Sequence, residues 1–226
     1  MIEELLPESV VAVEAQRDDP LWDAPFYPGE AAHVERAVAR RRREFAAVRG
    51  CARRAMEKLG VPAQSVLSGE RGAPRWPDGL IGSMTHCDDY CAAALARTDD
   101  LASLGIDAEP DGPLPEEVGA FVCLPAEAER LDRLAGQRPD VHWDRILFSA
   151  KESVYKAWFP LTRTWLEFSE ADITLAPSPG DATHGTLRAE LLVRGPRVGG
   201  RRLQVFDGRW AVRDGVVATA VVVPHP

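Results

Sequence analysis

The clearest pattern of apolar and polar positions lies in residues 148–158, FSAKESVYKAW. Its apolar residues recur at the three- and four-residue spacing that places side chains on one face of a helix; they are Ala150, Val154, Ala157 and Trp158. We therefore predict a helix over residues 142–159. Glu152 and Lys156 are four residues apart, so their side chains lie on one side of it. A surface ion pair of this kind contributes only about 0.3–0.5 kcal/mol, and taken alone this stretch favours that interpretation.

The rest of the chain divides into helical and strand-like segments. Residues 29–59 have a helical pattern, with a break near an arginine run, and end at Gly60 and Pro62, which commonly stop a helix. Residues 116–134 form a further helix, with plausible core positions at Phe121, Leu124, Ala128, Leu131 and Leu134. Strands are predicted at residues 9–15, 80–86, 90–96 and 101–110, and later at 166–175, 186–193, 202–206, 210–212 and 216–223.

The segment 111–115, DGPLP, is the clearest candidate boundary in the chain. Each side of it combines helices with strands that look antiparallel. The sequence therefore predicts the α+β class, with two similar-sized subdomains at residues 1–110 and 111–226.

Composition narrows the class of protein. A chain of 226 residues with 45% hydrophobic residues predicts a packed globule, and a net charge of −8 argues against a general nucleic-acid binder. No apolar run reaches the ~18 residues of a membrane span, and the acidic N-terminus lacks the order of a signal peptide. We therefore expect a cytoplasmic protein without a membrane partner. The four cysteines form no CxxC pair, so reduced thiols are expected rather than a zinc site.

The charge is unevenly distributed, because residues 36–58 hold nine basic residues against two acidic ones. Arg42, Arg49 and Arg53 are offset by seven and four, so they share one helical face. Such a face is either solvated, as most charge runs are, or binds phosphate, whose oxygens match the planar guanidinium. Spacing alone leaves these two interpretations equally open.

Two short segments carry candidate chemistry. In LASLGIDAEP, Asp107 and Glu109 alternate along a strand and project from one face, where their charges repel. Carboxylate oxygens suit Mg²⁺, although a strand end in solvent gives the same pattern; the apolar flanks favour a buried strand and a metal. In LIGSMTH, His86 ends a strand beside small residues that allow close approach to the backbone. A lone histidine is more often structural than catalytic.

The order of GSMTH, GIDAE and FSAKESVYKAW, preceded by RREFAAVRGCARRA and RGAPRWP, closely resembles the 4′-phosphopantetheinyl transferases. Within that family, the chain looks most like the Sfp/enterobactin-type group, which serves secondary metabolism. The resemblance covers about residues 36–159. It implies Mg²⁺-dependent transfer of the phosphopantetheine arm of coenzyme A to a serine of an acyl, peptidyl or aryl carrier protein, as in polyketide and nonribosomal peptide synthesis. It also implies a pseudo-twofold pair of α+β subdomains with the site in the cleft between them.

The resemblance also implies roles for single residues. Asp107, Glu109 and Glu152 hold Mg²⁺, and Glu152 is the base toward the serine, directly or through water. Lys156 stabilises the leaving oxygen and is a candidate to protonate it. Phosphates are contacted by His86 and Lys151, and the 3′-phosphate by Arg49, Arg53 and Arg42. Thr85, Gly72 and Pro74 match motifs on the adenosine side. Ala73 replaces the lysine common in this loop, and Arg71 or Arg75 is expected to take over its contact.

Two alternatives carry less support. One is a Mg²⁺-dependent hydrolase of nucleotide diphosphates, and the other is a non-catalytic module that binds coenzyme A or a carrier. Neither explains why the arginine face and the motifs around His86 and Glu152 occur together. A monomer is expected, since the two halves of one chain supply the whole cleft.

Overall fold

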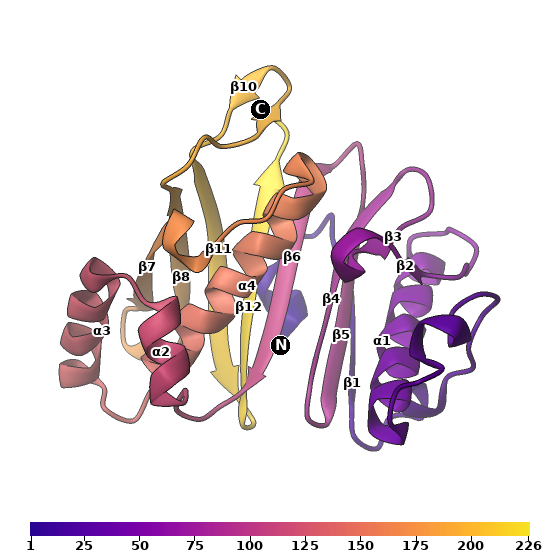
Figure 1. Ribbon diagram of the computed structural model, residues 1–226, viewed down its shortest axis with the longest axis horizontal. Helices are drawn as coiled ribbons and strands as arrows, with labels where there is room; N and C mark the ends of the chain where they lie inside the picture. Colours follow the sequence, from indigo (N-terminus) through magenta and orange to yellow (C-terminus); the bar gives the residue numbers. More distant parts are fainter.

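The computed structural model describes residues 1–226, apart from the side chain of Ala182. Its first half holds a three-stranded antiparallel sheet with the order β1-β5-β4, covered on one face by the helix α1 (Figure 1). The bounds are Val11–Gln16 for β1, Tyr90–Arg97 for β5, Leu80–Cys87 for β4 and Ala39–Lys58 for α1. The 3₁₀ turns η1, η2 and η3 span Ile2–Leu5, Pro20–Asp23 and Ala31–Val34. Between α1 and β4 lie β2 (Leu67–Ser68), η4 (Glu70–Gly72) and β3 (Pro74–Arg75).

The second half holds a five-stranded antiparallel sheet with the order β6-β12-β11-β8-β7, on which the helix α4 packs. Its strands are β6 (Leu101–Pro110), β7 (Ala171–Ser178), β8 (Asp181–Leu191), β11 (Val205–Arg213) and β12 (Val216–Pro224). The helices are α2 (Glu116–Val122), α3 (Pro125–Gln137) and α4 (Trp143–Thr162), and η5 is Phe168–Glu170. The short strands β9 (Arg197–Val198) and β10 (Arg201–Arg202) form a separate pair.

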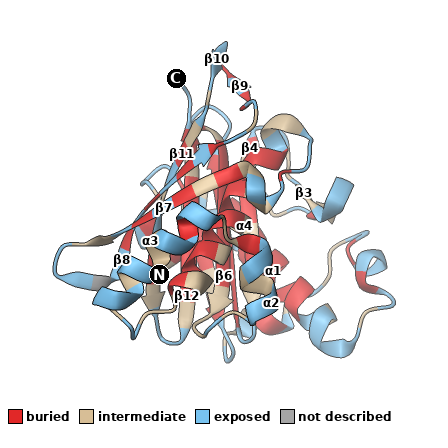
Figure 2. Cartoon of the chain, turned by 60° about the vertical axis from the view of Figure 1, so that its left-hand side comes forward, coloured by how far each residue is buried: buried red, intermediate tan, exposed pale blue. Residues whose placement is uncertain are grey.

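The two sheets meet where β6, an edge strand of the second sheet, lies beside β4 of the first (Figure 1). Two hydroxyls of β4 take the place of a strand ladder there. The Ile106 amide donates to Ser83 Oγ at 3.0 Å, and the Ala108 amide donates to Thr85 Oγ1 at 3.0 Å. The backs of both sheets share one apolar core that η1 covers. Buried residues therefore run through both sheets and the inner face of α4 (Figure 2).

The α+β class is confirmed, as are the strands predicted before residue 110 and the long helix that became α4. β6 belongs to the sheet of the second half, although it precedes the expected boundary at 110/111. That boundary and the pseudo-twofold relation stay predictions. Within the described residues, no helix is long and apolar enough to cross a membrane.

Several predicted elements differ from the structure in their bounds. Residues 116–134 form two helices, because Leu124 is extended ahead of Pro125. Of their predicted core positions, Phe121 is 71% exposed and Ala128 is exposed, while the carboxylate of Glu127 is fully buried. Helix α4 continues through Pro160 and ends at the left-handed residue Arg163. The strand predicted from residue 166 begins only at 171, and the two segments 202–206 and 210–212 are largely one strand, β11.

Candidate active site

A cleft of about 830 Å³ lies between the two halves. Its walls come from α1, from β4, from the outer side of α4, and from residues 68–76, which we call the lip. Its charged lining is mainly basic, although the chain has a net charge of −8. Such a concentration of positive charge predicts an anionic ligand. The cationic residues are Arg41, Arg49, Arg71, Arg75, Lys156 and Arg163, against the acids Glu70 and Glu152.

Helix α1 contributes a stripe at positions 41, 45, 48 and 49. Arg49 is only 4% exposed and lies over the ring of Phe45, at 3.1 Å from its centroid. Its guanidinium donates to Val66 O at 2.7 Å and to Ser68 Oγ at 3.1 Å. Burial lowers the pKa of Arg49 to about 10, so the group stays charged at neutral pH. These contacts fix one cation between α1 and the lip.

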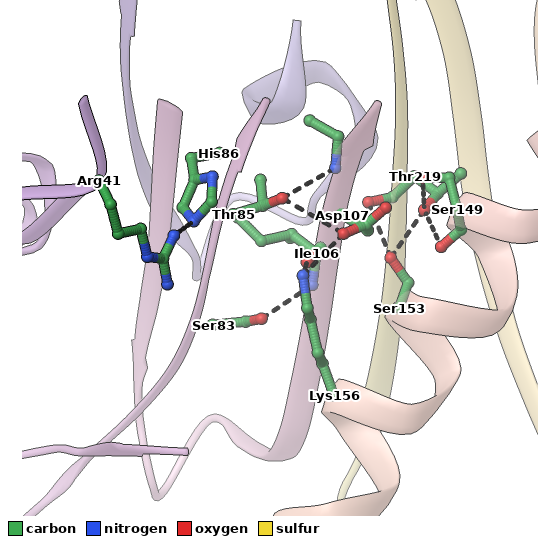
Figure 3. Close-up of polar contacts among 11 residues, drawn as sticks. Arg41, Ser83, Thr85, His86, Ile106, Asp107, Ser149, Ser153, Lys156 and Thr219 are labelled. Atoms are coloured by element: carbon green, nitrogen blue, oxygen red, sulfur yellow. Dashed lines mark hydrogen bonds and ion pairs between the residues drawn. The ribbon is translucent and has the colours of Figure 1, made fainter. Parts of the chain in front are cut away.

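His86 lies at the end of β4 and faces Arg41 of α1 (Figure 3). Its Nε2 contacts Arg41 Nη1, and its Nδ1 is 4.0 Å from Glu44. Burial, followed by the charge of Arg41, lowers the pKa of His86, so the imidazole is neutral at pH 7. Because a guanidinium only donates, Nε2 accepts from Arg41, and the one N–H of the neutral ring is on Nδ1.

Asp107 lies on β6 at the meeting point of the two halves and is 4% exposed. Its Oδ1 accepts from Lys156 Nζ at 2.7 Å and from Thr85 Oγ1 at 3.3 Å (Figure 3). Lys156 also donates to Ile106 O at 3.1 Å. One cation of α4 is thereby fixed at the carboxylate of β6, a contact that neither the i,i+4 pattern nor the strand alternation predicted.

Glu152 lines the cleft one helical turn before Lys156. Burial raises the pKa of Glu152, the charge of Lys156 lowers it, and the charge of Asp107 raises it again. The net rise makes Glu152 a stronger base than an ordinary surface glutamate.

These carboxylates suit Mg²⁺ only in part. Asp107 Oδ2 is buried and has no hydrogen-bond partner among the described residues, which is a state that a cation relieves. Within the same residues, however, no three His, Cys, Asp or Glu side chains gather closely enough to hold a metal. Glu109 is the member that departs, because its carboxylate accepts from Arg145 Nη1 at 3.0 Å. The expected set of three ligands is therefore not formed. Asp107 and Glu152 remain as oxygen donors, and a Mg²⁺ site at these two carboxylates stays a prediction.

Three cations expected at phosphates do not line the cleft. Arg53 is 5% exposed and pairs with the fully buried Glu30 at 2.9 Å. Arg42 donates to Val34 O at 3.0 Å. Lys151 is 3% exposed and pairs with Glu127 at 2.8 Å. The segment before α1 covers the face shared by Arg42 and Arg53. Backbone and carboxylate oxygens of this segment accept hydrogen bonds from both guanidinium groups.

The contacts expected of the remaining residues stay predictions, although these residues lie at the cleft. Gly72, Pro74, Arg75, Thr85 and His86 all line the cleft. The sequence interpretation missed Arg41, although its spacing to Phe45, Val48 and Arg49 follows one helical face. It also missed Tyr155 and Arg163, whereas Arg71, expected as an alternative to Arg75, lines the cleft too. Arg71 Cζ lies over the ring of Trp165, 5.4 Å from its centroid. The ring centroids of Trp165 and Tyr155 are 4.7 Å apart.

Sequence comparisons with known proteins match both halves of the chain. The model of the 4′-phosphopantetheinyl transferase N-terminal domain matches residues 29–96, and that of the 4′-phosphopantetheinyl transferase superfamily matches residues 103–194. The 4′-phosphopantetheinyl transferase Svp of Streptomyces mobaraensis is 56% identical over 100% of this chain and 90% of its own length. Npt of Nocardia iowensis is 46% identical, over 98% of this chain and 99% of its own. PptT of Mycobacterium tuberculosis is 44% identical, over 99% and 98%.

Enterobactin synthase component D of Salmonella typhi is a more distant relative, 33% identical over 67% of this chain and 60% of its own length. Svp, Npt and PptT are each at least 44% identical to this chain, and each is matched over at least 90% of its own length. All three carry the name 4′-phosphopantetheinyl transferase. The chain belongs to the 4′-phosphopantetheinyl transferase family.

Proposed function

We propose that the cleft binds coenzyme A and that the chain transfers its phosphopantetheine arm to a serine of an acyl, peptidyl or aryl carrier protein. The observation that carries this proposal is a basic cleft that is lined by Glu152 and Lys156, with Lys156 bound to the buried carboxylate of Asp107. A diphosphate entering the cleft meets cations along its walls and a candidate base, Glu152, beside Lys156.

The transfer forms a bond between the serine oxygen and the phosphorus that bears the pantetheine arm. The bond from that phosphorus to the bridging oxygen breaks, and the electron pair leaves on adenosine 3′,5′-bisphosphate. The serine proton passes to Glu152, directly or through a water, and the raised pKa of Glu152 favours this step. Lys156 lies next to the charge that develops on the leaving oxygen and neutralises it.

The phosphates are held by groups from both halves. His86 and Arg41 face the diphosphate from the first half, opposite Lys156 of the second. Arg49 binds the 3′-phosphate, because its guanidinium is fixed at the wall between α1 and the lip. Gly72, Pro74 and Arg75 of the lip flank the adenosine. Asp107 and Glu152 would hold Mg²⁺, which would supply positive charge to the diphosphate.

The test is incubation with a panel of apo carrier proteins, coenzyme A and Mg²⁺, read by intact mass. We expect one carrier at least to gain one phosphopantetheine arm. Asp107→Ala and Glu152→Gln should abolish the gain, while the exposed matched variant Glu129→Gln keeps it. Full activity of either site variant contradicts the mechanism.

Further arms of the same experiment separate the alternatives. Nucleotide released from coenzyme A without any carrier indicates a hydrolase. Binding of coenzyme A without turnover, under any divalent metal, indicates a binding module. The proposal also places the enzyme in the cytoplasm as a monomer, and light scattering of the purified chain tests its oligomeric state.

A further inference from the structure

Thr219 lies in the middle of β12, is fully buried, and stands directly opposite Asp107 in the β12–β6 register. Its side chain faces α4, where it meets two serines (Figure 3). Thr219 Oγ1 donates to Ser149 O at 2.9 Å. The same oxygen is 2.9 Å from Ser149 Oγ and 2.7 Å from Ser153 Oγ, and Ser153 Oγ also donates to Thr219 O at 3.2 Å. One residue of β12 thus binds two successive turns of α4.

This polar contact is surrounded by an apolar interface. Ser149, Ser153 and Thr219 are all 0% exposed, and the neighbouring contacts come from alanine and valine side chains. Burying a hydroxyl is unfavourable unless it is hydrogen-bonded. The three hydroxyls satisfy one another only when α4 sits at one position along β12. Apolar packing tolerates small displacements of a helix better than a network of this kind does.

The network lies at the centre of the candidate site. Glu152 stands between the two serines in the sequence, and Lys156 follows Ser153 by three residues. Asp107 is the cross-strand neighbour of Thr219. The helix also approaches β6 closely, since Ser103 Oγ donates to Ala157 O at 2.7 Å. The position of Thr219 therefore relates the helix with the base and the lysine to the strand with the carboxylate.

We propose that Thr219 is a positioning residue. Through Ser149 and Ser153 it fixes α4 relative to β6, so that Glu152 and Lys156 meet Asp107 at the distance the reaction needs. This inference rests on the proposed transferase function of the site. It assigns Thr219 no contact with coenzyme A or with the carrier.

The test compares Thr219→Val, which keeps the shape and loses the hydroxyl, with Thr219→Ser, which keeps the hydroxyl. A misplacement of about 1 Å costs on the order of 100-fold in rate, so we expect kcat of Thr219→Val to fall by roughly 10- to 100-fold. KM for coenzyme A should stay within about twofold, because Arg49 and the lip are untouched. Thr219→Ser should recover kcat to within about threefold of the parent.

Val221→Ala is the matched control, because Val221 is buried on the same face of β12 and carries no hydroxyl. It lowers stability without disturbing the network, and kcat should not change at temperatures where the variant is folded. A Thr219→Val enzyme with full kcat overturns the proposal. Equal losses of kcat in Val221→Ala and Thr219→Val overturn it too, since they show a general effect of stability. Should Thr219→Val fail to fold, Ser153→Ala replaces it with the same expectations.

A crystal structure of the Thr219→Val variant separates this inference from the transferase proposal. We expect α4 to shift along β6 and the Lys156–Asp107 contact to lengthen from 2.7 Å. An unmoved helix contradicts the positioning role even if no carrier is ever modified. If helix α4 shifts in the variant but the parent chain has no transferase activity, only the proposed function is contradicted.

Discussion

Replacing Lys151 by methionine tests whether this lysine belongs to the active site or to the interior. Its ammonium donates to Glu127 Oε2 at 2.8 Å, to Phe168 O at 2.6 Å and to Ala171 O at 2.9 Å. All three of its donors are therefore used within the protein. Burial lowers the pKa of Lys151, and the hydrogen bond and charge of Glu127 oppose that effect. The group is held as one half of a buried ion pair.

The loss follows from what Lys151→Met leaves behind. The Glu127 carboxylate is 0% exposed and remains bound to the amides of Leu124 and Ile173. Removing one partner of a buried pair costs about 3–5 kcal/mol, because the other charge stays unpaired. At roughly 2–4 °C per kcal/mol for a chain of this size, the midpoint of thermal unfolding should fall by roughly 6–20 °C. Lys151→Met with Glu127→Gln removes both charges and should recover part of the loss.

The assay is urea unfolding followed by circular dichroism, together with KM for coenzyme A measured well below the unfolding transition. Lys58→Met, at an exposed lysine of α1, is the matched control and should change the free energy of unfolding by less than about 0.5 kcal/mol. KM for coenzyme A should stay within about twofold in Lys151→Met. Unchanged stability with a strongly raised KM would refute the buried assignment and restore the phosphate contact that the resemblance implied.

Three further predictions follow from the same geometry. Burial raises the folded-state pKa of Glu152 above its ordinary value of 4.5, so ionising this group lowers the stability of the fold as the pH rises from 4.5 through the folded-state pKa. Glu152→Gln should therefore unfold at the same or a higher urea concentration than the parent at pH 7. A lower urea midpoint would contradict the raised pKa. Arg49→Met should weaken binding of coenzyme A more than of 3′-dephospho-coenzyme A in calorimetry, whereas equal weakening argues against a 3′-phosphate contact. Gly105→Ala should yield no soluble folded protein, because its Cβ would lie 2.0 Å from Ser153 O, while Gly136→Ala, which meets no atom within 4 Å, should express normally.

The sequence was sufficient wherever a side chain's partner follows from local periodicity. The alternation around Asp107 and the helical spacing of Glu152 and Lys156 placed these residues correctly on β6 and α4. Their meeting depends on the two halves coming together, and the order of motifs indicated that without showing the contact. The ion pair between Lys156 and Asp107 connects the predicted helix with the predicted strand.

The sequence was insufficient where a distant segment decides which face of an element is covered. Arg53 and Arg49 are one helical turn apart on α1 and both buried, yet Arg53 pairs with the carboxylate of Glu30 while Arg49 lines the cleft. Lys151 and Lys156 lie on either side of Glu152 in the sequence, but Lys151 forms a buried ion pair with Glu127 of α3. Glu109 follows Asp107 on one face of β6, and Arg145 takes its carboxylate. Each partner lies on another element, so no periodicity within α1, α4 or β6 could identify it.

The seam between β4 and β6 has a mechanical consequence. A regular ladder resists separation over its whole length, whereas the amides of Ile106 and Ala108 rest on two hydroxyl groups, those of Ser83 and Thr85. Each sheet keeps its own hydrogen bonds if these two are lost, while the apolar core shared by the two sheets still joins the halves. The exchange of these two amide protons with deuterium is therefore a direct gauge of how often the seam loses its hydrogen bonds.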